Sequence, residues 1–263
     1  MTHGLYAVNS ALIAAILFVT VLLVMEGGYR LGRKRQILSD DPIKSQFTAI
    51  QGSLLGLISL LLGFSFSIAL SHYDKRSEAM LQEANAIGTT YLRAHSLPDT
   101  VKNETLAVLE RYVDVRVQTT NISVADQAAR ESLLREGGQL RAKLWGLAMK
   151  SVKDDDRITT TGLYVQTLND LIDACGTRDE ILNRHVPEAV IFLLLITFVL
   201  AGSVLGYTSG VAGHRPTMAV IGFMVIVVVL VSMIMDLDRP RRGFIQVSQK
   251  NMLELQEEVR NSR

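Results

Sequence analysis

Residues 50–70 read IQGSLLGLISLLLGFSFSIAL and contain no Asp, Glu, Lys or Arg. A helix that crosses the hydrocarbon core of a bilayer needs about 20 mostly apolar residues. Three further uncharged, apolar stretches of similar length cover residues 4–25, 189–209 and 218–235. Such uncharged runs exceed what a buried helix of a soluble protein requires. The sequence therefore predicts four transmembrane helices.

The region between the second and third spans, residues 72–187, is the only part that can form a water-soluble domain. Its apolar residues recur every three or four positions, as at Leu106, Leu109 and Val113, which predicts helices. We expect the second span to continue as a helix to about Ala94. A helix over 159–186 is expected to run directly into the third span, and Gly137-Gly138 is expected to break a helix.

These patterns predict an all-α integral membrane protein with an extramembrane helical bundle between its two hairpins. The expected domains are a first transmembrane hairpin (1–71), the bundle (72–187), a second hairpin (188–236) and a basic, polar C-terminal tail (237–263). We expect the protein to lie in the bacterial inner membrane as a multi-pass protein, with the lipid bilayer as its surroundings.

Composition and motifs exclude several classes of function. The chain has 27 Lys+Arg against 26 Asp+Glu, a formal net charge of +1, which argues against nucleic acid as a partner. Cys175 is the only cysteine, and no Cys/His cluster has the spacing of a zinc site. Enzyme signatures for phosphate, dinucleotide or nucleophilic chemistry are absent from the sequence. We therefore expect no catalytic residues, metal site or cofactor.

Small residues form a stripe along the second span. They follow one another by three or four positions, which keeps them on one side of a helix. The members are Gly52, Gly56, Ser59, Gly63 and Ser67. Small residues on one face favour close helix packing. The alternative is that they face a water-filled axis in an oligomer, where they leave room for a permeating ion.

Two other groups of residues are expected to serve helix packing. In the third span, Gly202, Gly206 and Gly210 repeat a small-xxx-small pattern that lets helices approach closely. On the helix that leaves the second span, Asn85 and Gly88 lie beside an apolar face. We expect Asn85 to set the register against neighbouring helices.

A dense charge cluster follows the fourth span. It comprises Asp236, Asp238, Arg239, Arg241 and Arg242. The arginines can contact lipid head groups, pair with the two aspartates, or form a positive ring at the mouth of a pore. Because simple lipid anchoring needs no aspartate, at least one specific ion pair is expected here.

Two histidines lie at the junctions between the soluble region and the membrane. His72 follows the second span and His185 precedes the third, on the same side of the bilayer. They can meet there and titrate near neutral pH, although a pair of ordinary interfacial histidines is the favoured interpretation.

Three segments resemble the bestrophin-like domain family of bacterial membrane proteins. They are LLGFSFSIALSHYD (61–74), EANAIGTTYLR (83–93) and DLDRPRRG (236–243). True bestrophins are pentameric anion channels whose second transmembrane helix lines the pore, so the resemblance implies a pentamer, inorganic anions as permeant ions, and a pore along the second span. Bestrophins carry a tryptophan-rich segment after the tyrosine that Tyr73 resembles. This chain lacks that segment, and Trp145 is its only tryptophan.

The orientation in the membrane has two opposed arguments. Arg30, Arg33 and Lys34 belong to a basic loop after the first span, and the positive-inside rule places that loop in the cytoplasm. The likeness to bestrophins instead places the bundle and the C-terminal tail in the cytoplasm. We prefer the first scheme because the first helix usually dominates orientation.

Two functions follow from these observations. The first is an oligomeric, bestrophin-like ion channel, selective for anions, with the second span toward the axis and Arg241 and Arg242 at one mouth. The second is a non-conducting membrane sensor or scaffold whose helical bundle binds a protein partner. Ion flux distinguishes them, because only the first predicts a leak in sealed vesicles.

Overall fold

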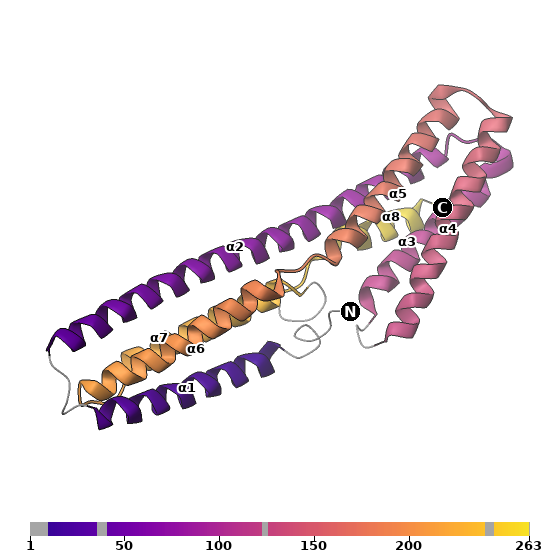
Figure 1. Ribbon diagram of the computed structural model, residues 1–263. Helices are drawn as coiled ribbons and strands as arrows, with labels where there is room; N and C mark the ends of the chain where they lie inside the picture. The colour runs from indigo at the N-terminus through magenta and orange to yellow at the C-terminus, as the bar shows by residue number, and fades with distance from the viewer. Residues whose placement is uncertain (1–9, 36–40, 123–125, 240–244, 263) are drawn as a thin grey trace. The chain divides into compact units, whose positions relative to one another are not determined.

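The computed structural model is all-helical over the residues that it describes, 10–35, 41–122, 126–239 and 245–262 (Figure 1). The helices are α1 (Ser10–Lys34), α2 (Asp41–Ala94), α3 (Asp99–Asn121), α4 (Gln127–Asp154), α5 (Leu163–Leu182), α6 (Glu188–Val211), α7 (Met218–Leu237) and α8 (Lys250–Asn261). A single π-helical turn, Ile158–Gly162, leads into α5. The predicted all-α class is confirmed.

Four of these helices are long and apolar enough to cross a membrane: α1, α2, α6 and α7. Each carries one of the four predicted spans, although residues 4–9 of the first span lie outside the described residues. Helix α2 is a single helix of 54 residues. The expectation that the second span continues as a helix to Ala94 is therefore confirmed.

The chain divides into two compact units. The first comprises Met1–Tyr73 and His185–Gln246, and the second comprises Asp74–Arg184 and Val247–Arg263. The first unit contains α1, the apolar part of α2, α6 and α7. The second contains the charged part of α2 together with α3, α4, α5 and α8.

The first unit is held together by apolar side chains from all four of its helices. Val21 of α1, Ile58 of α2, Phe198 of α6 and Met224 of α7 are each fully or almost fully buried in one cluster. Helices α6 and α7 form a hairpin. At its turn Gly213 adopts φ 82°, and the N–H groups of Gly213 and His214 donate to the carbonyls at the end of α6. This is the usual glycine-terminated helix end.

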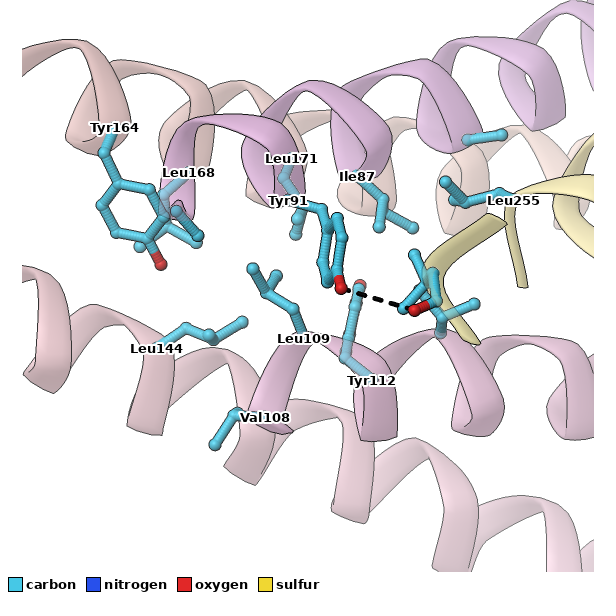
Figure 2. Close-up of a cluster of buried hydrophobic side chains, with 14 of the residues drawn as sticks. Ile87, Tyr91, Val108, Leu109, Tyr112, Leu144, Tyr164, Leu168, Leu171 and Leu255 are labelled. Carbon is cyan, nitrogen blue, oxygen red and sulfur yellow. Dashed lines mark hydrogen bonds between the residues drawn. The ribbon is translucent and has the colours of Figure 1, made fainter. Parts of the chain in front are cut away.

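The second unit has its own apolar core (Figure 2). Ile87 of α2, Leu109 of α3, Leu144 of α4 and Leu168 of α5 are all completely buried there. Helix α8 joins the same core through its apolar face, which includes Leu255.

Helix α8 is fixed by polar contacts as well. The Tyr91 hydroxyl of α2 donates to the carbonyl of Val259 at 3.4 Å, the bond that Figure 2 draws. Gln256 and Arg260 both donate to Asp114 of α3. The C-terminal segment, which sequence analysis described only as a basic, polar tail, thus contributes a helix to the bundle.

Two expectations about helix ends were wrong. Helix α4 runs without a break through Gly137 and Gly138, because burial of Leu144 and Leu147 from the same helix in the bundle core outweighs the poor helix propensity of glycine. Helix α5 ends at Leu182 and does not run into α6. Pro187 explains this end, since the residue before a proline is disfavoured in the helical conformation and proline itself suits a helix start.

Candidate functional site

The small-residue stripe of α2 is exposed along its whole length within this chain. Gly52, Gly56, Ser59, Gly63 and Ser67 all have exposed positions. A Cβ built on any of the three glycines would meet no neighbouring atom within 4 Å in the described part of the chain. The stripe is also uncharged, and the Ser59 hydroxyl donates to the carbonyl of Leu55 at 2.9 Å. This face of the first unit is therefore smooth, neutral and uncovered.

The glycines of α6, in contrast to those of α2, lie directly against another helix, α1. A Cβ on Gly206 would lie 2.0 Å from the Met25 carbonyl oxygen of α1, and one on Gly210 would lie 2.3 Å from that of Tyr29. Gly202 faces the Val21 side chain, with its Cβ position 2.9 Å from Cγ1. Only glycine permits this approach of two helix backbones.

Two glycines of α1 complete that contact and were missed by the sequence analysis. Gly28 and Gly32 lie against backbone oxygens of α6, with Cβ positions 2.3 Å from Ser203 O and 2.2 Å from Tyr207 O. They form a small-xxx-small pair of the kind found in the third span. The predicted first span ended at Met25, before the charged Glu26, so Gly28 and Gly32 lay outside it and their spacing was not considered.

Asn85 and Gly88 lie on the charged part of α2, beside α8. A Cβ on Gly88 would be 3.3 Å from the Leu255 side chain, so a small residue is favoured where α8 crosses. Asn85 is exposed and, with Gly88, lines an open groove of about 370 Å³ that Asn251 and Glu254 border on the α8 side.

The acidic residues at the end of α7 are buried. Both carboxylate oxygens of Asp238 accept a hydrogen bond from the Val186 backbone N–H at 3.0 Å. The two histidines from the junctions meet at the same carboxylate: Nδ1 of His72 lies 3.3 Å from one oxygen and Nδ1 of His185 lies 3.5 Å from the other. Asp238 therefore joins the end of α7 to α2 and to the segment before α6.

The rest of this charge cluster is only partly described. The Asp236 carboxylate accepts a hydrogen bond from the Ile245 N–H at 2.8 Å, and both Asp236 and Arg239 are buried. Arg241 and Arg242 lie outside the described residues. The described aspartates thus accept hydrogen bonds from backbone N–H groups, and Asp238 also lies beside two histidines. The sequence analysis had considered lipid head groups, pairing between the arginines and these aspartates, and a pore mouth.

Replacing Asp238 with alanine should destabilise the first unit. The change leaves the buried Val186 N–H without its acceptor and separates both imidazoles from their carboxylate. A hydrogen bond to a charged group contributes about 1.5–3 kcal/mol, so we expect the Tm to fall by roughly 5–10 °C in thermal unfolding of the purified protein. Asp74→Ala, at an exposed position of α2, is the control and should leave the Tm unchanged. Equal Tm values for the two variants would contradict the role of Asp238 as a stabilising, buried hydrogen-bond acceptor.

A buried ionic network occupies the second unit. The carboxylate of Glu83, on α2, is completely buried and pairs with Arg116 of α3 at 2.6 Å and with Arg178 of α5. Arg116 also lies 3.4 Å from Asp179. Burial alone would raise the pKa of Glu83, but the charges of Arg116 and Arg178 outweigh it and lower that pKa.

Sequence analysis assigned no role to this network. Glu83 lies one helical turn before Ile87 on the buried face of α2, so a charge in register with apolar residues was the available signal. Its two partners lie on other helices, and helical periodicity does not reveal such long-range pairs.

The fold and these sites define a multi-pass helical membrane protein in which four apolar helices form one unit, with α1 and α6 closely packed, and an ion-paired helical bundle forms the other. The sequence model of the Bestrophin-like domain matches residues 13–252. The chain belongs to this family, and the predicted resemblance is confirmed. No curated protein matches the chain.

Solved structures of bacterial bestrophin homologues share the fold. One point mutant of a homologue from Klebsiella pneumoniae superposes with a TM-score of 0.70 at 13% identity, covering 94% of this chain and 97% of the homologue. A second point mutant from the same organism gives a TM-score of 0.67 at 15% identity, with coverages of 92% and 97%. A structure of the Klebsiella homologue phased by Zn-SAD gives 0.63 at 15% identity, with coverages of 91% and 98%.

Proposed function

We propose that the protein is a homo-oligomeric ion channel of the inner membrane that conducts inorganic anions along α2. The observation that carries the proposal is the uncovered stripe from Gly52 to Ser67, in a unit whose other glycine-rich helix, α6, is closed against α1. Membership of the Bestrophin-like domain family supports it, because the second transmembrane helix lines the pore of bestrophins. By the same likeness we propose a pentamer.

A path between subunits agrees with the chemistry of the stripe. Small side chains leave space near an axis. The Ser67 hydroxyl, and that of Ser59 once it turns away from the Leu55 carbonyl, can donate to an anion that has lost part of its hydration shell. The stripe carries no acidic residue that would repel an anion. We propose that Arg241 and Arg242 add positive potential at one mouth, with the bundle of the second unit outside the membrane.

Ion flux through the purified protein in liposomes tests this function. We expect vesicles that contain the protein to release chloride faster than potassium at matched gradients. Vesicles that stay sealed although they contain a well-folded oligomer would overturn the channel and favour the sensor or scaffold. Crosslinking through residues 72–187 should then recover its protein partner.

Replacing Gly63 with leucine should reduce chloride flux at least about tenfold without preventing assembly, because a bulky side chain on the stripe fills the conduction path. The matched control is Gly222→Leu on α7, where a Cβ also meets nothing within 4 Å. We expect the control to retain its flux and both variants to keep the oligomer size of the parent in gel filtration. Unaltered chloride flux in Gly63→Leu would contradict the assignment of α2 as the pore-lining helix.

A further inference from the structure

A cavity of about 230 Å³ opens among three helices of the second unit. Its lining includes apolar side chains and charged ones from α3, α4 and α5: Val115, Arg116, Leu133, Leu134, Arg141 and Asp179. Val115 and Arg116 form buried wall, whereas Leu134 is 39% exposed and the Asp179 side chain is 41% exposed. The cavity therefore reaches solvent on the side of Leu134 and Asp179.

The charges around this cavity do not balance. The carboxylates of Glu83 and Asp179 balance the guanidinium groups of Arg116 and Arg178 within the network, and Arg141, which lines the cavity, adds one positive charge. Arg116 and Arg178 share Glu83, and Asp179 lies 3.4 Å from Arg116. The excess charge is that of Arg141.

The side chain of Arg141 contacts a thiol, whereas a partly buried guanidinium usually pairs with a carboxylate. Its Nη1 donates to the Cys175 sulfur at 3.1 Å, and the Tyr112 side chain lies beside the same guanidinium. Burial raises the pKa of the Cys175 thiol, so the sulfur is uncharged at neutral pH and does not neutralise the guanidinium. In the described part of the chain this half-buried guanidinium, with five donors, thus lines the cavity without an ion pair to a carboxylate.

Gly137 keeps the space beside Arg141 open. Glycine in the middle of a helix is unfavourable relative to alanine, so its place in α4 calls for a reason. Gly137 is buried, lines the cavity, and a Cβ there would lie 3.7 Å from Val115 and 3.9 Å from Arg141 Nη1. Alanine would therefore fit but would take up part of the cavity.

We propose that this cavity binds a small aliphatic monocarboxylate, with its carboxylate on Arg141 and its hydrocarbon part against Val115, Leu133 and Leu134. One uncompensated positive charge matches one carboxylate, and guanidinium binds that group through two parallel hydrogen bonds. Asp179 at the opening disfavours anions of higher charge. The volume lies below the roughly 300–1,000 Å³ of sites for drug-sized ligands, so the ligand is short.

Butyrate is the probe, and the full-length protein in detergent is titrated with it by saturation-transfer NMR. We expect saturable binding of butyrate and at least about tenfold weaker binding of the uncharged isostere butyramide. Inorganic phosphate, added as a competitor, should displace butyrate only at concentrations at least about tenfold higher than those of unlabelled butyrate. Butyramide binding as tight as butyrate would overturn the role of the charge, and the absence of saturable butyrate binding would overturn the proposal. Neither outcome depends on whether the protein conducts ions.

Two variants locate the ligand. Arg141→Gln should weaken butyrate binding about tenfold or more, because it removes the charge-assisted hydrogen bonds. Gly137→Ala should raise the Tm of the free protein yet weaken butyrate binding, so a loss of binding there is not a failure to fold. Arg111→Gln is the matched control: this exposed arginine pairs with Glu136, and its removal should leave binding unchanged. Unchanged binding in both Arg141→Gln and Gly137→Ala would overturn the assignment to this cavity.

Discussion

Replacing Gly206 with alanine is expected to abolish the folded protein. The new methyl group would lie 2.0 Å from the carbonyl oxygen of Met25, and that oxygen belongs to a helix backbone that cannot rotate away. The clash can be relieved only if α1 and α6 separate, which opens the contacts that Gly28 and Gly210 make along the same pair of helices. Forced overpacking usually costs about 1–3 kcal/mol, and a backbone clash of this kind lies at or above the upper end.

The yield of monodisperse protein in detergent measures this effect. We expect Gly206→Ala to aggregate or to be degraded, and the reciprocal change Gly28→Ala, whose Cβ would lie 2.3 Å from Ser203 O, to behave in the same way. Gly222→Ala on α7 and Gly52→Ala on α2 are the controls, because a Cβ meets nothing within 4 Å at either position. Normal yield and unchanged Tm for Gly206→Ala would show that α1 and α6 do not pack through their backbones.

The contrast between the two glycine-rich helices marks the limit of what sequence could predict. Gly56 of α2 and Gly206 of α6 belong to equally regular small-residue patterns, yet the structure buries one pattern and exposes the other. Spacing determines which residues share a helix face, whereas the neighbour of that face depends on the other helices. Close packing against another subunit and an open axis are therefore alternatives for α2 that spacing alone does not decide.

The apolar runs predicted the spans because the bilayer imposes a length and an apolar composition that few other structures need. The same reasoning failed for the polar contacts. Asp238 and Val186 are far apart in the chain, and Glu83 meets Arg116 and Arg178 through tertiary structure alone. Charged residues in a helical pattern are usually exposed to solvent, so the local signal, Glu83 in register with the apolar Ile87, did not by itself indicate a buried ion pair.

Replacing Glu83 with glutamine is expected to destabilise the second unit by about 3–5 kcal/mol, the usual cost of removing one partner from a buried ion pair. Glutamine keeps the size of the side chain, so the effect isolates the charge. It leaves Arg178 buried with the Thr120 hydroxyl at 3.4 Å, and leaves Arg116 with the partly exposed Asp179.

The same network predicts an acid limit to stability. The pKa of Glu83 is lowered in the folded protein, so its contribution to the free energy of unfolding is complete above the ordinary glutamate pKa of about 4.3 and is lost as the pH falls through the lowered value. We expect the Tm of the parent protein to fall toward that of Glu83→Gln as the pH drops below about 4, while the difference between them stays constant from pH 5 to pH 7. A difference that vanished at pH 6 would contradict the sign of this shift.

Cys175 provides a built-in probe for this prediction, because it is the only cysteine and is 1% exposed in the same unit. A maleimide reacts with it only when the bundle opens, so a loss of about 3–5 kcal/mol should accelerate labelling by about two to four orders of magnitude where opening is in rapid equilibrium. Glu104→Gln is the matched control, since Glu104 pairs with Lys143 on the exposed surface of the same bundle and its loss should leave the labelling rate nearly unchanged. If Glu83→Gln labels no faster than Glu104→Gln and the two unfold at the same temperature by circular dichroism, the buried network does not hold the bundle together.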